Sequence, residues 1–381
     1  MVGRARNPGR PVRREFDYLL AAVRQFFRPE TQLPSAEGLD WNEVVRLAQS
    51  HAVTPFLYRV CHNAELRDGV REMAHFSLTL SAELVKLLAV FEEQQITVVP
   101  LKGPVLSTAL YGDQALRPST DLDLLVRPSD LLRTKSLLER TGYRMESVIH
   151  WPVDSACFEC RDRELSFSDP TDRVSADVHW RLLPGYFPVP FDEVGAWRNL
   201  HSVPWEGKKV WTLAPEHLVL FLCAHGTKHL WQRLGWICDI ARLIQVEPDI
   251  DWSEVFSQAS RTHTSRMVSL GLLLASELLG AQLPPAVAER VAGDSRTRAL
   301  ASTVMDGLRA GASASAVDTT LFSIRAFERI GQRARFVFGI FVQPTEAEYR
   351  ALQLPPGLHW LYYLFRPLRL AIKYGCRLTG L

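Results

Sequence analysis

Residues 121–126 read Asp-Leu-Asp-Leu-Leu-Val, and this stretch decides the fold. The apolar positions predict a strand held in a core. Because alternate residues on a strand point to one face, Asp121 and Asp123 project together. Two carboxylates held side by side repel each other unless a cation compensates, and Mg²⁺ favours carboxylates together with phosphates and water. The pair therefore indicates a metal site. A strand end with two solvated acids is the alternative interpretation.

An anion-binding segment is predicted upstream of the acidic strand. Residues 96–101 form a short apolar run typical of a buried strand, and Lys102-Gly103-Pro104 follows it. Because proline is favoured in the first turn of a helix, we expect a short helix from Pro104 to Tyr111. Its N-terminus offers N–H groups to an anion, Lys102 adds a positive charge, and Gly103 allows close backbone approach. The next loop holds further phosphate-binding candidates, which are Arg117, Ser119 and Thr120.

A third acid comes from residues 175–180, Ser-Ala-Asp-Val-His-Trp, which read as a strand with Asp177 on its polar face. If this strand lies beside the acidic strand, Asp177 joins Asp121 and Asp123. Two-metal phosphoryl transfer uses about three carboxylates to hold ions on both sides of the reacting phosphorus. Asp177 is also a candidate to take the acceptor's proton. An acid on an edge strand is the alternative interpretation.

Polar side chains recur at helical spacing after Pro215, where one long helix is expected to continue to Ile244. Three- and four-residue intervals place these side chains on one face. The face is a candidate clamp for a phosphate, a ribose or an acceptor, with Asp239 orienting a His or Lys. A polar stripe satisfied within the protein is the alternative. The residues are His225, Lys228, His229, Gln232, Trp236 and Asp239.

The rest of the chain alternates between helical and mixed patterns. The expected units are a disordered basic tail at 1–14, an N-terminal helical region at 15–95, a core at 96–213 with further strands near 143–150 and 158–167, and a C-terminal helical region at 214–381. Asp40 is a candidate N-cap for a helix beginning at Trp41. This pattern predicts an α+β fold, in which a small mixed sheet is flanked by N-terminal and C-terminal helices.

Composition narrows the class of protein. A net charge of +2 over 381 residues argues against a dedicated nucleic-acid binder. Six cysteines in a chain of this size are expected to stay reduced, which indicates a cytoplasmic location. No run of eighteen apolar residues occurs, so we expect no membrane span. The segment 359–378 mixes aromatic and basic residues, which fits a terminal helix packed on the body or a helix in weak contact with a membrane surface.

One set of motifs extends along most of the chain, from about Asp40 to Leu370. Its members are Leu101-Lys102-Gly103, Leu110-Tyr111, Arg117, residues 121–126, residues 177–180, residues 225–231, Leu234, Trp236, Asp239, Leu354-Pro355-Pro356, Leu361-Tyr362-Tyr363 and Arg366-Pro367. Together they resemble a bacterial family of uncharacterised nucleotidyltransferases in the polymerase-β-like superfamily. The resemblance implies that Asp121 and Asp123 bind the metal and that Asp177 is the third catalytic carboxylate.

The resemblance also implies an activity, the transfer of a nucleoside monophosphate from an NTP to an acceptor hydroxyl or amine with release of pyrophosphate. Mg²⁺ is the expected ion, with Mn²⁺ as a substitute, and the acceptor is a small molecule, a protein or RNA. Lys102-Gly103 stands where the superfamily usually has Gly-Gly or Gly-Ser, but farther from Asp121. The expected ligand-binding residues are Lys102, Gly103, Arg117, Ser119, His225, Lys228, His229 and Asp239. The alternative is a non-catalytic nucleotide-binding or regulatory protein that retains the fold.

Overall fold

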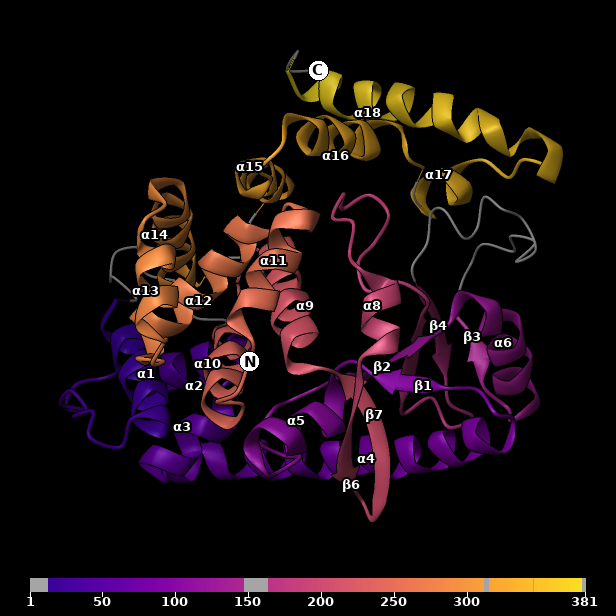
Figure 1. Ribbon diagram of the computed structural model, residues 1–381. Helices are drawn as coiled ribbons and strands as arrows, with labels where there is room; N and C mark the ends of the chain where they lie inside the picture. Colours follow the sequence, from indigo (N-terminus) through magenta and orange to yellow (C-terminus); the bar gives the residue numbers. More distant parts are fainter. Residues whose placement is uncertain (1–12, 147–163, 312–314, 345, 379–381) are drawn as a thin grey trace, which may run out of the picture.

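A five-stranded mixed sheet lies on one side of the molecule in the computed structural model, which describes residues 13–146, 164–311, 315–344 and 346–378 (Figure 1). The strand order is β1-β2-β5-β4-β3, with β2 and β5 parallel and the other pairs antiparallel. The strands are β1 (Val98–Pro100), β2 (Asp121–Val126), β3 (Arg144–Met145), β4 (Glu164–Ser168) and β5 (Ser175–His179). The expected α+β fold is confirmed. β3 and β4 fall in the strands expected at 143–150 and 158–167, and the remainder of those ranges lies largely outside the described residues.

Alternation along the strands gives the sheet two different faces. One face is apolar, and Leu122, Leu124 and Val178 on it pack against α4 (Arg67–Glu93) and α6 (Leu131–Arg140). Figure 1 shows α4 passing beneath the sheet. The other face carries the acids, because the parallel register of β2 and β5 pairs Asp123 with Asp177.

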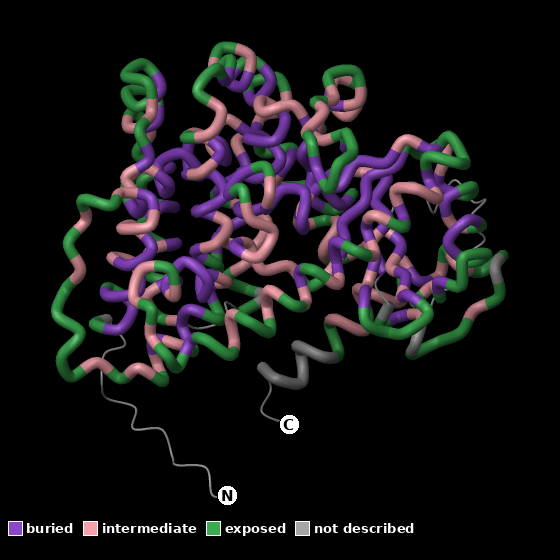
Figure 2. Tube along the Cα trace, turned by 90° about the horizontal axis from the view of Figure 1, so that it is seen from below, coloured by how far each residue is buried: buried purple, intermediate pink, exposed green. Residues whose placement is uncertain are grey.

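The N-terminal and C-terminal helices form one body. Arg24 of α1 (Arg13–Phe27) and Arg28, directly after this helix, donate hydrogen bonds to the carbonyl oxygens of Leu278 and Gly280, at 2.7 and 2.9 Å. One apolar core includes side chains from both ends of the chain, and Figure 2 shows buried positions inside this body and inside the sheet part. The expected N-cap Asp40 is confirmed, since its side chain accepts a hydrogen bond from the backbone N–H of Glu43.

The remaining elements complete this body and link it to the sheet. They are α2 (Trp41–Ser50), α3 (Thr54–Cys61), α5 (Gly103–Tyr111), α8 (Glu193–Arg198), the hairpin β6 (Leu200–Trp205) and β7 (Lys208–Leu213), α9 (Pro215–Lys228), α10 (Leu234–Val246), α11 (Trp252–Thr262), α12 (Ser265–Leu279), α13 (Pro285–Ala292), α14 (Ser295–Ala310), α15 (Ala316–Ala326), α16 (Ile330–Val342), α17 (Glu346–Ala351) and α18 (Tyr362–Leu378). α1 begins at Arg13, two residues before the boundary expected for the first helical region, and residues 1–12 of the expected tail lie outside the described residues.

The single helix expected between Pro215 and Ile244 is instead two helices, α9 and α10. Leu230 and Trp231, between them, have φ values of 55° and 51°, in the left-handed region. The Trp231 side chain is fully buried, and a Cβ added at Gly226 would lie 2.6 Å from it. The packing of this indole against a glycine in the preceding helix therefore accounts for the break.

One helical run among the described residues, Ala64–Glu93, is long and apolar enough to cross a membrane by length and composition alone. Leu80, Leu84 and Leu87 on this run are buried in the core beneath the sheet. Core helices of ordinary globular proteins have the same length and composition, so the run is weak evidence for a span.

Candidate active site

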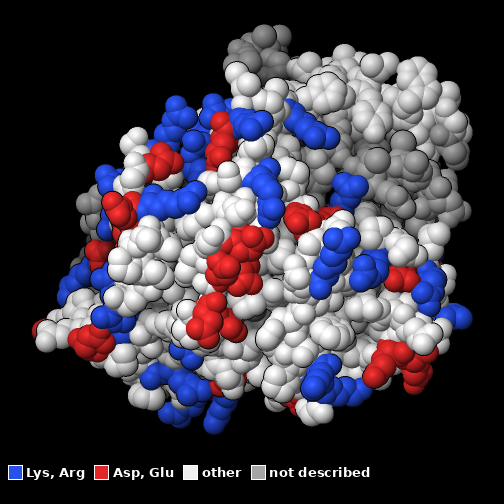
Figure 3. Space-filling view, in the orientation of Figure 1, with Lys and Arg blue, Asp and Glu red and all other residues white. Residues whose placement is uncertain are grey.

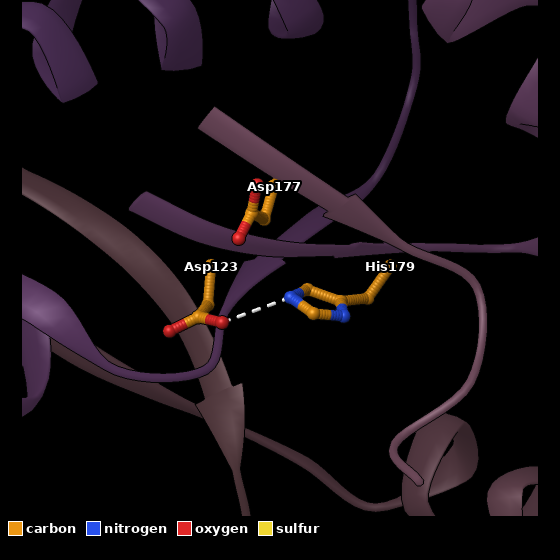
Figure 4. A group of neighbouring side chains, drawn as sticks. All are labelled: Asp123, Asp177 and His179. Carbon is orange, nitrogen blue, oxygen red and sulfur yellow. Dashed lines mark hydrogen bonds and ion pairs between the residues drawn. The ribbon is translucent and has the colours of Figure 1, made fainter. Parts of the chain in front are cut away.

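Three side chains from neighbouring strands converge on one point of the sheet (Figure 4). Asp123 and Asp177 are paired in the parallel register, and His179 lies two residues further along β5, so all three point to the same face. One potential ligand atom from each residue lies within 4.8 Å of those of the other two. Two carboxylates and an imidazole at this spacing can hold a divalent cation.

Asp123 is the most firmly held of the acids. Its Oδ2 lies 3.1 Å from Lys102 Nζ, and its Oδ1 lies 2.9 Å from His179 Nε2. Burial alone would raise the pKa of Asp123, but Lys102 and His179 hold that pKa well below its usual range. The other ring nitrogen of His179, Nδ1, lies 3.2 Å from Glu164 Oε2. Asp123 is therefore ionised and oriented by the chain's own side chains.

The pKa values of Asp121 and Asp177 are shifted in the opposite direction to that of Asp123. Burial, followed by the negative charge of Asp123, raises the pKa of Asp121 to about 6. Burial also raises the pKa of Asp177. A divalent cation relieves this cost, because it neutralises carboxylates that repel one another. Carboxylate oxygens are ligands that suit Mg²⁺ and Mn²⁺, so this donor set fits the expected ions.

The positive groups expected upstream lie beside these acids. Helix α5 begins directly after Lys102, and its first residue, Gly103, has φ +76°. Glycine adopts this left-handed conformation without strain, and a Cβ at this position would lie 3.8 Å from the carbonyl oxygen of Asp121. The start of α5 and the Lys102 ammonium group therefore adjoin the β2 acids, an arrangement that suits an anion next to a metal site.

Arg117 and Asp239 form an ion pair for which the sequence carries no signal. Arg117 Nε lies 2.9 and 3.1 Å from the two carboxylate oxygens of Asp239, and its Nη1 donates to Ser119 Oγ at 3.0 Å. The hydroxyl of Tyr111 also donates to Asp239 Oδ1, at 3.1 Å. The sequence predicts a His or Lys partner for Asp239, and the structure gives Arg117 instead. Arg117 and Asp239 thus join the loop before β2 to α10.

These groups open onto a cleft of about 960 Å³ between the sheet and the helical body. Its lining includes Lys102, Arg117, Ser119, Thr120, Asp121, Asp123, His225, His229, Gln232, Trp236 and Asp239. The polar residues predicted to share one helical face therefore line the same cleft as the acids, with the exception of Lys228, although they belong to two helices and the turn between them. Among the described lining residues, the predicted site residues Gly103, Asp177 and Lys228 are absent.

Three rings form the wall of the cleft opposite the acids. The His225 and His229 ring centroids lie 4.7 Å apart, and the Trp236 ring lies 5.5 and 5.3 Å from them. Burial lowers the pKa of His225 well below its usual range, and the nearby charge of Lys102 lowers it further. His225 is therefore neutral, and the three rings present flat surfaces to the cleft that the acids also line.

Two residues of this site are missing from the sequence-based prediction. His179 has a local signal, because it lies two positions after Asp177 on the same strand and so shares its face. Tyr111 has none, since its partner Asp239 lies 128 positions along the chain. Contacts over such distances depend on how the helices pack.

The chain resembles parts of several solved structures and matches one family model. The solved structures that resemble this chain include a lincosamide antibiotic adenylyltransferase, LnuA, bound to lincomycin (18% identity over 37% of this chain and 84% of that chain, TM-score 0.27). A second is ANT(2")-Ia in complex with adenylyl-2"-tobramycin, with 15% identity over 56% of this chain and 98% of that chain and a TM-score of 0.27. A third is an antigenic nucleotidyltransferase-like protein from Paracoccidioides brasiliensis, with 18% identity over 56% of this chain and 95% of that chain and a TM-score of 0.30. No curated protein matches the chain. The model of a family described as "Uncharacterised nucleotidyltransferase" matches residues 37–280, more than half of the sequence, and the chain therefore belongs to this nucleotidyltransferase family.

Proposed function

We propose that the protein transfers a nucleoside monophosphate from an NTP to an acceptor hydroxyl or amine, releases pyrophosphate, and requires Mg²⁺, for which Mn²⁺ can substitute. The observation that carries this proposal is the register of β2 and β5, which sets Asp121, Asp123 and Asp177 on one face. Crowded carboxylates beside a lysine and a helix N-terminus suit a site that holds a divalent ion and a phosphate chain together.

Asp121, Asp123 and Asp177 are the residues that would hold the ion. When bound, the ion neutralises negative charge on the triphosphate and makes its phosphorus more electrophilic. Lys102 and His179 keep Asp123 ionised and in place. Asp121 loses its proton as the ion binds, because its raised pKa reflects repulsion that the ion removes.

The transfer forms a bond between the acceptor oxygen or nitrogen and the α-phosphorus. The bond from that phosphorus to the oxygen bridging to the β-phosphate breaks, and pyrophosphate leaves with both electrons. Asp177 takes the proton from the acceptor. Lys102 and the N–H groups at the start of α5 bind the phosphates and stabilise the charge that develops on the leaving group. Ser119 and Arg117 extend this phosphate-binding surface.

The cleft favours a small-molecule acceptor over RNA. Its volume of about 960 Å³ is at the upper end of typical ligand pockets, enough for a nucleotide and a small second substrate. Its charged lining residues are Lys102, Arg117, Arg233, Glu72, Asp121, Asp123 and Asp239, so acids outnumber bases. A nucleic acid needs a basic groove. His225, His229 and Trp236 would contact the acceptor or the base of the nucleotide.

Incubation of the protein with each α-labelled NTP, Mg²⁺ and a cell lysate tests the proposal, with mass analysis of what becomes labelled. We expect label in the small-molecule fraction and none with Asp123→Asn. Label in protein or RNA would contradict the acceptor class while retaining the transfer. NTP binding without transfer to any fraction would instead support the alternative of a non-catalytic nucleotide-binding protein.

A further inference from the structure

Exposed apolar side chains are concentrated at the C-terminal end of the protein, away from the cleft. Sixteen large hydrophobic side chains are exposed among the described residues, and nine of them lie between residues 330 and 372, so this segment differs from the rest of the surface. We define the C-terminal apolar face as Phe338, Phe341, Leu358, Trp360, Leu364, Leu368 and Ile372. Figure 1 shows α16 and α18 side by side at the top of the molecule. Apolar surface concentrated in this way indicates an interaction site.

Helix α18 has its polar side turned inward. Arg366 donates to the carbonyl oxygen of Ile340 on α16 at 2.7 and 2.9 Å, and both Arg366 and Arg369 pair with the buried Glu348 of α17. Tyr362, one turn earlier on the same side, is also buried.

The apolar side of α18 therefore faces outward. Leu364, Leu368 and Ile372, spaced four residues apart, are 64%, 59% and 60% exposed. A surface helix of a globular protein normally buries its apolar side, so this orientation needs an apolar partner outside the described chain. Because the arginine bonds fix the helix, the face is presented without any rearrangement.

The net charge of the C-terminal segment indicates which kind of partner binds this face. Residues 329–381 hold eight Lys or Arg and two Glu, a net charge of +6, whereas the whole chain carries +2, so residues 1–328 have a net charge of −4. Where its residues are described, the surface at the upper right of Figure 3 shows no charged side chain, in contrast to the mixed charges over the rest of the face in view. An apolar face with aromatic and leucine side chains, in a segment of net positive charge, is typical of a helix that lies in an anionic membrane surface.

We propose that the C-terminal apolar face binds the surface of an anionic lipid bilayer. Trp360 and the leucines of α18 enter the boundary between headgroups and acyl chains, and Arg335, which is exposed one turn before Phe338 on α16, lies among the anionic headgroups. A second copy of the chain fits this face less well, because two segments of charge +6 would repel each other. None of the residues of this face lines the cleft, so the proposal is independent of the transferase activity.

Co-sedimentation of the full chain with vesicles tests this proposal. One set of vesicles contains only phosphatidylcholine, and the other contains equal parts of phosphatidylcholine and phosphatidylglycerol. We expect binding to the anionic vesicles that weakens at high salt. The double variant Leu364→Ser/Leu368→Ser is expected to lower the partition coefficient roughly tenfold or more, since each buried CH₂ group contributes to anchoring. Leu132→Ser, which alters an exposed leucine on α6, is the matched control and is expected to bind normally.

Equal binding to both kinds of vesicle, or no binding to either, would overturn the proposal. Dimerisation in analytical ultracentrifugation that Leu364→Ser/Leu368→Ser abolishes, without vesicle binding, would assign the face to a second copy instead. Both leucines are exposed, so the variants are expected to keep the melting temperature of the natural sequence, and this measurement confirms that the fold is intact.

Discussion

Arg117, in the loop before β2, and Asp239, on α10, form a buried ion pair between residues 122 positions apart. Their side chains are only 12% and 2% exposed. The pair lies in the lining of the cleft and connects the sheet to the helical body. Its first role is therefore to fix the two sides of the cleft relative to each other, with any phosphate contact of Arg117 secondary.

Removal of one partner of this pair is expected to destabilise the protein strongly. Asp239→Asn or Arg117→Ala leaves a buried charge without its partner, which typically lowers the free energy of unfolding by about 3–5 kcal/mol. The double variant Arg117→Ala/Asp239→Asn should lose less than the sum of the two single changes. Urea denaturation of the four proteins gives the coupling energy. Strict additivity would contradict an energetic link between the two residues.

Asp121→Asn is expected to stabilise the metal-free protein while abolishing transfer. The pKa of Asp121 is raised from 3.8 to about 6. In the pH window between these two values, the folded state therefore binds a proton that the unfolded chain releases. The contribution of Asp121 to stability therefore falls as pH rises through the window, and about two pKa units correspond to about 3 kcal/mol.

Melting temperatures with and without Mg²⁺ check this prediction. The variant should melt above the natural sequence near neutral pH, and the difference should disappear near the lower end of the window. Mg²⁺ should raise the melting temperature of the natural sequence more than that of the variant. A variant that melts lower at neutral pH would show that Asp121 carries no electrostatic cost.

His179 is predicted to be a positioning residue that acts through Asp123. His179→Ala removes the 2.9 Å contact to Asp123 and leaves that carboxylate mobile, so we expect metal affinity to fall by about 10- to 100-fold. His179→Gln can place a donor near the position of Nε2 and should retain more of that affinity. Transfer rates over a range of Mg²⁺ concentrations separate the two cases. The same loss in both variants at saturating Mg²⁺ would contradict a positioning role.

Lys102→Ala is expected to weaken NTP binding without weakening metal binding. The ammonium group lies 3.1 Å from Asp123. Its removal leaves the negative charge of that carboxylate without this neighbouring positive charge, which favours binding of a metal cation. The triphosphate, in contrast, loses a positive partner. Calorimetric titrations with Mn²⁺ alone and with NTP and Mg²⁺ distinguish the effects. Unchanged NTP affinity would remove Lys102 from the phosphate site.

Gly226→Ala is expected to destabilise the fold through the turn between α9 and α10. The added Cβ would lie 2.6 Å from the Trp231 ring, and overpacking of this kind costs about 1–3 kcal/mol. Gly307→Ala, in α14, meets no atom within 4 Å and should stabilise by about 0.5–1 kcal/mol, since alanine is the better helix former. Thermal denaturation compares the two, and a tolerated Gly226→Ala would show that Trp231 can move aside.

The acidic face was the part of the site that local sequence could predict. Strand periodicity alone places Asp121 with Asp123, and it would also have placed His179 with Asp177. The end of α9 could not be predicted in this way, because Leu230 and Trp231 adopt their left-handed conformations to bury an indole between Gly226 and the distant Gly271 of α12. The partner of Asp239 could likewise not be predicted from the neighbouring sequence, since Arg117 approaches it only when the sheet and the helical body pack together.

The contacts of α1 with α12 have a consequence for the order of folding during synthesis. Arg24 donates a hydrogen bond to a carbonyl oxygen 254 positions later, so α1, which packs on α2 and α3 as soon as they are made, meets α12 only after most of the chain has been synthesised. At roughly 5–20 residues per second, the ribosome needs on the order of 10–50 seconds to synthesise this stretch. The part of α1 that packs on α12 stays uncovered for that interval, which makes the nascent N-terminal helices a binding site for chaperones before the protein is fully folded.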